Sequence, residues 1–406
     1  MMFRGRILAA LIAALVMVGA GLGVAHAETA PPVAVPSGVS YELIDRWDVD
    51  KLNHILTVDS PEFFSSDVAY TPAVNAVRLY RVTYPSVVPE KGNKPIMASG
   101  LLAVPETDAT RFPMVSYQHG TVYLKTEVPS FPAQSGETQL MIAQFAGQGY
   151  VLIGADYFGM GTSTEPEGYG VKASLQQASF DMLLAAGSVL NQMELSTDKL
   201  FIGGWSEGGF ATMAFLERLE GAGVKVDGAA TASGPADIYS LLSGFLDFPR
   251  KNDAAWVSIL YVLSAFSFED YYGVPGLARS VIAEDYYDAA RRVYDRTSIE
   301  GDEVPSDLSK LIRPEYFDPQ FFANSAYGRL ALETQAYRWI IKTPLRNYYG
   351  EADEIVSVGL GQLVESFQKG IGGGNPMVEA ISTGTTDHRG TFASAVAQWK
   401  PWFDGL

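Results

Sequence analysis

The sequence contains no cysteine among its 406 residues. This absence excludes disulfide bonds, thiolate-bound metals, iron–sulfur clusters and cysteine nucleophiles, so the core alone has to stabilise the fold. Basic residues are also scarce, because 29 Lys and Arg stand against 46 Asp and Glu, for a formal net charge of −17. An acidic protein repels phosphate backbones, and nucleic acid is therefore not an expected partner.

The sequence also lacks two motifs, one typical of nucleotide hydrolases and one of zinc hydrolases. There is no phosphate-binding loop that ends in Gly-Lys-Ser or Gly-Lys-Thr, and no His-x-x-x-His pair. Nucleotide hydrolysis and zinc-dependent hydrolysis are therefore not supported, and we expect neither a metal nor another cofactor. The glycines at 372–374 precede no lysine, and we interpret them as a flexible connection.

What the chain does contain is typical of a packed globular protein. Hydrophobic residues make up 47% of the sequence and aromatic residues 12%. The length suits one large α/β domain with an insertion, or two modest domains.

The first 27 residues have the pattern of a signal peptide. Arg4 and Arg6 precede an apolar run over 7–18, and Ala25-His26-Ala27 supplies small residues at a cleavage site. We expect cleavage after Ala27 and a secreted or periplasmic protein. No basic stop-transfer cluster follows the run, so we expect no stable membrane anchor after cleavage.

Strand and helix patterns alternate along most of the chain. Residues 28–74 form an N-terminal arm whose first part, to about residue 40, is expected to be a flexible lead-in. Strand patterns then occupy 75–82, 96–104, 114–118, 150–155, 200–202, 228–233 and 344–349. Helical patterns occupy 138–147, 174–193, 210–216 and 391–403. This alternation predicts a mostly parallel sheet covered by helices on both faces, built from residues 75–236 and 343–406.

The interval 237–342 interrupts the alternation, and we call it the cap. It contains amphipathic, aromatic-rich stretches that predict helices over 256–266, 281–294 and 331–341. An insertion of this size between two strands has to lie at the end of the sheet. Its aromatic residues either line an apolar acyl pocket or, as we prefer, pack the core of the cap itself: Tyr261, Phe266, Phe268, Tyr271 and Tyr272.

The pattern Gly-x-Ser-x-Gly occurs once, at residues 204–208, between the strand pattern at 200–202 and the helical pattern at 210–216. A serine on a sharp turn between a strand and a helix exposes its hydroxyl beside a backbone N–H. The pattern therefore predicts that Ser206 is a nucleophile. The amide of Glu207, directly after it, is then one donor of an oxyanion hole.

A serine nucleophile needs a base, and the sequence has only four histidines. His26 belongs to the signal peptide, His54 to the N-terminal arm, and His119 precedes the nucleophile. His388 alone follows Ser206, as the chain order Ser, acid, His requires. We therefore predict His388 as the base, and His119 as a residue that shapes its loop through hydrogen bonds.

The acid that orients the base should follow a strand between Ser206 and His388. The strand at 344–349 is followed by three carboxylates, among which Asp353 has the favoured position and Glu351 is the alternative. The second oxyanion donor should come from the loop after the strand at 114–118. Gly120 lets the backbone turn there, and the Thr121 amide is our first choice for the donor.

Five motifs occur in one order: SYQHGT at 116–121, DYFGMG at 156–161, GWSEGG at 204–209, GPAD at 234–237 and YGEAD at 349–353. Together they resemble the bacterial branch of the secretory lipase-like α/β-hydrolases, over roughly residues 95–240 and 343–392. The resemblance implies an α/β-hydrolase fold with a helical cap, and Ser206, Asp353 and His388 as a triad. Glu207 departs from the neutral residue expected after the serine, and its charge would disfavour anionic substrates.

These patterns predict an exported serine carboxylesterase or lipase that acts on a small-molecule or lipid ester through an acyl-enzyme. A serine rather than an aspartate at the turn argues against dehalogenases and epoxide hydrolases. Two alternatives stay open from the sequence. One is an amidase or peptidase that uses the same triad, and the other is a catalytically silent binding protein with this fold.

Overall fold

The computed structural model describes residues 33–35, 38–297 and 303–406. The predicted signal peptide, residues 1–27, and its cleavage site lie outside the described residues. No helix within the described ranges is both long and apolar enough to cross a membrane.

One ten-stranded sheet runs through the molecule, with the strand order β1-β2-β3-β4-β6-β5-β7-β8-β9-β10. The strands are β1 (Val33–Val35), β2 (Val39–Trp47), β3 (Val77–Val88), β4 (Lys94–Pro105), β5 (Arg111–Gln118), β6 (Val151–Ala155), β7 (Ser196–Trp205), β8 (Gly228–Ala232), β9 (Leu345–Tyr349) and β10 (Val378–Ser382). Six strands, β6, β5, β7, β8, β9 and β10 in their order across the sheet, pair in parallel. Strands β1 to β4 extend the sheet beyond β6 through antiparallel pairs.

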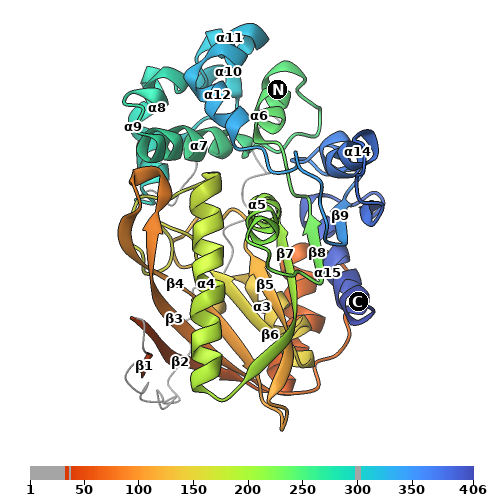
Figure 1. Ribbon diagram of the computed structural model, residues 1–406. Coiled ribbons are helices and arrows are strands. Elements are labelled where there is room, and N and C mark those ends of the chain that lie inside the picture. Colours follow the sequence, from red (N-terminus) through yellow and green to blue (C-terminus); the bar gives the residue numbers. More distant parts are fainter. Residues whose placement is uncertain (1–32, 36–37, 298–302) are drawn as a thin grey trace, which may run out of the picture.

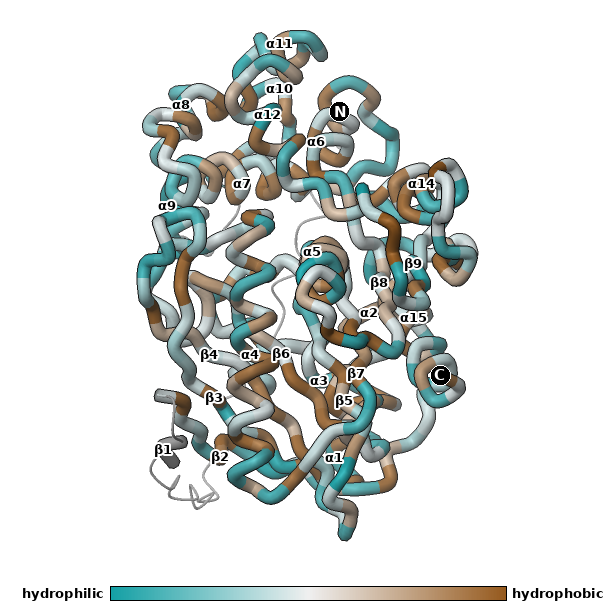
Figure 2. The backbone as a smooth tube through the Cα atoms, in the orientation of Figure 1, coloured by the Kyte–Doolittle hydropathy of each residue, from teal (hydrophilic) through white to brown (hydrophobic). Residues whose placement is uncertain are grey.

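The parallel strands are apolar because helices cover both of their faces. Every residue of β6 and of β8 is buried, and much of β6 is brown in Figure 2. Continuous apolar runs of this kind are typical of parallel strands at the centre of a sheet.

The covering helices form a layer on each face of the sheet (Figure 1). One layer consists of α4 (Lys172–Gln192) and α5 (Glu207–Gly221). The other consists of α1 (Val49–His54), α2 (Ser60–Phe64), α3 (Gly136–Gln144) and α15 (His388–Asp404). Two further helices, α13 (Val358–Gly361) and α14 (Leu363–Gly370), lie between β9 and β10 in the chain.

The cap contributes a cluster of helices over the carboxyl ends of the parallel strands (Figure 1). Its helices are α6 (Ile238–Asp247), α7 (Val257–Tyr272), α8 (Leu277–Val281), α9 (Tyr287–Tyr294), α10 (Leu308–Leu311), α11 (Pro319–Asn324) and α12 (Ala326–Glu333). Asp237 begins α6, because its side chain accepts a hydrogen bond from the amide of Ser240 at 2.9 Å.

Two of the three helices predicted for the cap, those over 281–294 and 331–341, have different bounds in the structure. The stretch 281–294 is divided, because Ile282 leaves the helical conformation to form a β-bridge with Ile312. The stretch 331–341 is helical only to Glu333. Beyond it the chain is irregular, and the buried side chain of Gln368 accepts from Ile341 N at 3.3 Å.

The N-terminal arm and the late part of the sheet also differ from the prediction. Residues 33–35 and 39–47 are strands of the sheet, so the expected flexible lead-in is wrong for its described part. The sequence reasoning also missed β10, which pairs in parallel with β9 at the edge of the sheet.

Candidate active site

Ser206 lies on the tight turn between β7 and α5. Its backbone has φ 57° and ψ −122°, a conformation that side chains rarely adopt. The glycines on either side allow the turn to close. A Cβ atom on Gly204 would lie 2.3 Å from the carbonyl oxygen of Gly208, and one on Gly208 would lie 1.9 Å from the carbonyl oxygen of Gln118. Only glycine fits at these two positions, as the nucleophile turn requires.

Three side chains from distant parts of the sequence meet at this turn. The Oγ of Ser206 lies 2.9 Å from Nε2 of His388. The Nδ1 of His388 lies 3.0 and 3.1 Å from the two carboxylate oxygens of Asp353. All three residues are buried. The predicted nucleophile, base and acid are thus within hydrogen-bonding distance in the order that proton transfer needs.

Asp353 occupies the loop after β9 and remains ionised. Burial alone would raise the pKa of its carboxyl, but the charge and hydrogen bond of His388 outweigh burial, and the pKa is lowered. The amides of Ile355 and Val356 each donate to Oδ1 at 2.8 Å and fix the carboxylate. The alternative acid, Glu351, instead accepts a hydrogen bond from Ser382 on the surface.

The backbone and ring of His388 have partners that the sequence did not indicate. Its amide donates to the carboxylate of Glu354 at 2.9 Å, and its carbonyl accepts from the indole of Trp205 at 3.2 Å. The ring of Trp205 lies 5.2 Å from the imidazole, and the ring of Trp256 from the cap lies 6.3 Å from it. Hydrogen bonds and aromatic packing together limit the orientations of the base.

The loop after β5 contacts α3 through Gly120. Its amide donates to Oε1 of Glu137 on α3 at 2.9 Å and is therefore not free to bind an oxyanion, whereas the predicted donor is the next amide, that of Thr121. The Thr121 amide donates no hydrogen bond within the described part of the chain. The Glu207 amide belongs to the first turn of α5 and has no intrahelical acceptor. Neither amide therefore donates a hydrogen bond to another described residue.

Glu137 itself could not be found from the sequence, because only the fold brings α3 under this loop. Its carboxyl is 4% exposed. Burial raises its pKa to about 8, although the hydrogen bond from Gly120 opposes the rise.

His119 lies beside two backbone carbonyls, and its neutral imidazole, which has one N–H, can donate a hydrogen bond to only one of them. Its Nδ1 lies 2.8 Å from the carbonyl oxygen of Gly120, and its Nε2 lies 3.2 Å from that of Asp156. Burial lowers its pKa to about 4, against the effect of these two carbonyls. The ring stacks on Tyr157 at 4.1 Å. His119 is a neutral, fixed part of the loop.

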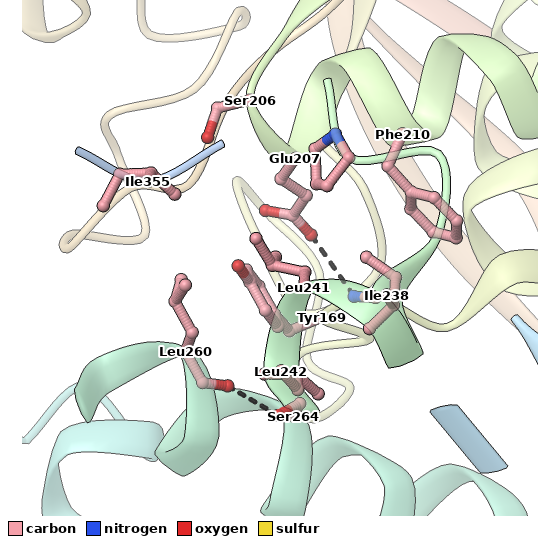
Figure 3. Close-up of a pocket in the computed structure, with 12 residues that line it drawn as sticks. Tyr169, Ser206, Glu207, Phe210, Ile238, Leu241, Leu242, Leu260, Ser264 and Ile355 are labelled. Atoms are coloured by element: carbon pink, nitrogen blue, oxygen red, sulfur yellow. Dashed lines mark hydrogen bonds between the residues drawn. The ribbon is translucent and has the colours of Figure 1, made fainter. Parts of the chain in front are cut away.

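A small cavity adjoins Ser206 beneath the cap (Figure 3). Its volume is about 20 Å³, which is room for about one water molecule. Its walls are mostly apolar: Tyr169, Gly170, Ser206, Glu207, Phe210, Pro235, Ile238, Leu241, Leu242, Leu260, Ser264 and Ile355. Residues of α6 and α7 form part of these walls, and at this volume the cavity admits nothing larger than water.

The five cap aromatics considered from the sequence do not line this cavity. Phe266 stacks on Tyr294 at 5.5 Å, and Phe268 packs against Tyr327 at 5.8 Å. The hydroxyl of Tyr271 donates to the carbonyl of Pro166. These side chains pack the cap and its junction with the sheet domain, as preferred. Within the described ranges, no group of three or more His, Asp or Glu residues is placed to hold a metal ion.

Comparisons with known proteins give matches at the level of structure. No family model and no curated protein matches the sequence. A predicted hydrolase from Legionella pneumophila has a TM-score of 0.77 and 20% identity, with 93% of this chain and 98% of that chain covered. The ligand-bound form of LipA, a rice cell wall degrading esterase from Xanthomonas oryzae, has a TM-score of 0.72 and 20% identity, with 89% and 94% covered.

A more distant match is Candida antarctica lipase A in its closed state. Its TM-score is 0.59 at 14% identity, with 89% of this chain and 82% of that chain covered. Identities this low establish the architecture and leave the substrate open. On the arrangement of its sheet, helices and serine turn, and on its likeness to these structures, the chain has the α/β-hydrolase fold.

Proposed function

We propose that the protein is an exported serine carboxylesterase or lipase that works through an acyl-enzyme. The observation that carries the proposal is the contact chain from Ser206 through His388 to Asp353, with distances of 2.9 and 3.0 Å. In an exposed polar network the same distances would be weak evidence for a catalytic site. Here the three groups are buried, and the serine has the strained backbone of a nucleophile turn.

The residues divide the reaction into two steps. In the first, Ser206 Oγ attacks the ester carbonyl, His388 Nε2 takes the hydroxyl proton, and the same proton passes to the departing alcohol. In the second, water loses a proton to His388 and attacks the acyl-enzyme, which releases the acid and restores the serine. Asp353 stays ionised, orients the imidazole and stabilises its charged form. The amides of Glu207 and Thr121 stabilise the oxyanion in both steps.

The cavity supports an ester with an apolar acyl chain, because its walls are largely aliphatic. Export rests on the leader pattern at 1–27, and the N-terminal residue of the mature protein tests it.

The test of the chemistry uses a fluorophosphonate probe and a series of chromogenic esters with increasing acyl length. We expect the probe to label Ser206, and Ser206→Ala to lose both labelling and turnover by several orders of magnitude. Ser264→Ala is the matched control. Its hydroxyl lines the same cavity but donates to the carbonyl of Leu260 within its own helix, so the variant should keep both.

Two results would redirect the assignment. Normal turnover by Ser206→Ala would exclude the mechanism. A higher rate on an amide than on an ester with the same acyl group would favour an amidase. The acyl length at maximum rate separates an esterase, with a short optimum, from a lipase, with a long one.

A further inference from the structure

Glu207 places an acidic side chain on the wall of the cavity, one residue after the nucleophile. The residue is 7% exposed. Its Oε1 accepts a hydrogen bond from the amide of Gly170 at 3.4 Å. No hydrogen bond from a described residue reaches Oε2, which faces the space between Ser206, Ile355 and Leu241 (Figure 3).

This carboxyl differs from the other polar groups on the cavity wall. The hydroxyl of Tyr169 is paired with Thr121 Oγ1 at 3.1 Å, and the hydroxyl of Ser264 is bonded to its own helix. Apart from Ser206, Glu207 is therefore the residue on the cavity wall whose side chain has an oxygen, Oε2, without a hydrogen bond from a described residue. An unpaired polar atom is costly beside an apolar acyl chain, because the chain removes water from it without replacing the hydrogen bond.

A purely structural role does not account for this residue. The one hydrogen bond of the carboxyl, at 3.4 Å, is longer than the usual 2.7–3.2 Å range of such bonds. Burial, and next the charge of Glu167, raise the pKa of the carboxyl well above its ordinary value, against the effects of the Gly170 amide and Arg296. A protonated carboxyl both donates and accepts, so it can pair with an uncharged polar group.

The cavity is on the acyl side of the site. The departing alcohol has to lie beside His388, which protonates it. His388 does not line the cavity, whereas Ser206 and Glu207 do. The part of the ester that stays on Ser206 is therefore the part that enters.

We propose that Glu207 makes the acyl site selective for uncharged acyl groups that carry a hydrogen-bonding substituent, a hydroxyl in the simplest case. This inference rests on the proposed ester hydrolysis. The hydroxyl pairs with the free oxygen of Glu207, and the aliphatic wall from α6 and α7 contacts the rest of the chain. Anionic acyl groups are excluded, because the site offers them a buried acid and no neighbouring cation on the wall.

The test compares two nitrophenyl esters that share a leaving group and differ in one substituent, 3-hydroxybutyrate and 3-methylbutyrate. Their acyl groups have nearly the same shape, so the ratio of their kcat/KM values reports the hydroxyl. The ratio is measured for the wild type, Glu207→Gln and Glu207→Met. Gln keeps a hydrogen-bonding side chain of the same length, and Met replaces it with an apolar one. Fluorophosphonate labelling of Ser206 shows that each variant keeps its nucleophile.

We expect the ratio to fall about tenfold from wild type to Glu207→Met, the size typical of one hydrogen bond in a binding site, and to be largely kept in Glu207→Gln. The wild type alone also tests the inference, since it should hydrolyse the uncharged hydroxybutyrate faster than the anionic hemisuccinate. Equal ratios in all three proteins, or faster hydrolysis of the hemisuccinate, would overturn the inference while the ester chemistry stands. A protein that hydrolyses none of these esters overturns the proposed function as well.

Discussion

The stability of the protein should depend on pH through Glu137, whose side chain accepts a hydrogen bond from the Gly120 amide in the loop after β5. Its carboxyl is buried, with a pKa of about 8 in the folded protein against an ordinary 4.5. The folded state therefore favours the protonated form, so the stability that Glu137 contributes is complete below about pH 4.5 and is lost as pH rises toward about 8. A shift of this size corresponds to as much as about 5 kcal/mol in the free energy of unfolding.

Glu137→Gln removes the ionisation and keeps an oxygen that can accept from the Gly120 amide at the same position. Urea unfolding at several pH values between 5 and 9 should show the wild type losing more stability than the variant as pH rises. The other buried acids are present in both proteins, so the difference reports Glu137. The exposed acid Glu351 gives the matched control, since Glu351→Gln should keep the wild-type slope. Parallel curves for the wild type and Glu137→Gln would refute the reasoning.

Three further predictions address the triad, the serine turn and the cavity. Asp353→Asn should lower kcat about 10⁴-fold and leave the thermal midpoint nearly unchanged, as expected when the base loses its orienting charge. Gly208→Ala should destabilise the fold or prevent it from forming, because the added Cβ meets the Gln118 carbonyl at 1.9 Å. Gly187→Ala, in open space on α4, should be neutral or stabilising by up to about 1 kcal/mol in the same melting assay. Leu241→Ala should move the optimum of the ester series to longer acyl chains, and an unchanged optimum would remove α6 from the acyl site.

The sequence was sufficient to select Ser206, His388 and Asp353, which the structure brings within hydrogen-bonding distance, because each is specified by chain order as well as by type. One Gly-x-Ser-x-Gly pattern and a single histidine after it leave few combinations. Asp353 follows from the end of a strand, and the structure shows the reason: its carboxylate is fixed by the amides two and three residues later. Local signals of this kind can be read directly from a sequence.

Features that depend on distant contacts could not be predicted in this way. The stretch 331–341 has a helical pattern, yet its later part is irregular, and the acceptors for the amides of Ala336 and Ile341 are the distant Ala236 carbonyl and Gln368 side chain. Glu137 can accept the hydrogen bond of the Gly120 amide only because the fold brings α3 next to the loop after β5. The hydrogen bond from the Gly120 amide could not be predicted for the same reason, because its acceptor lies 17 residues away.

Connectivity explains why substrate selection should reside next to the serine rather than among the cap aromatics. Only five residues, 233–237, separate β8 from α6, so the first turns of α6 have to lie over the parallel strand ends and over Ser206. Phe266 and Phe268 of α7 instead pack against Tyr294 and Tyr327 inside the cap. Glu207 is covalently adjacent to the nucleophile, and the strained turn that orients Ser206 also fixes the start of α5. Its side chain can therefore be changed in length or polarity while the glycines keep the serine in position, so the proposed selectivity can be tested separately from the proposed chemistry.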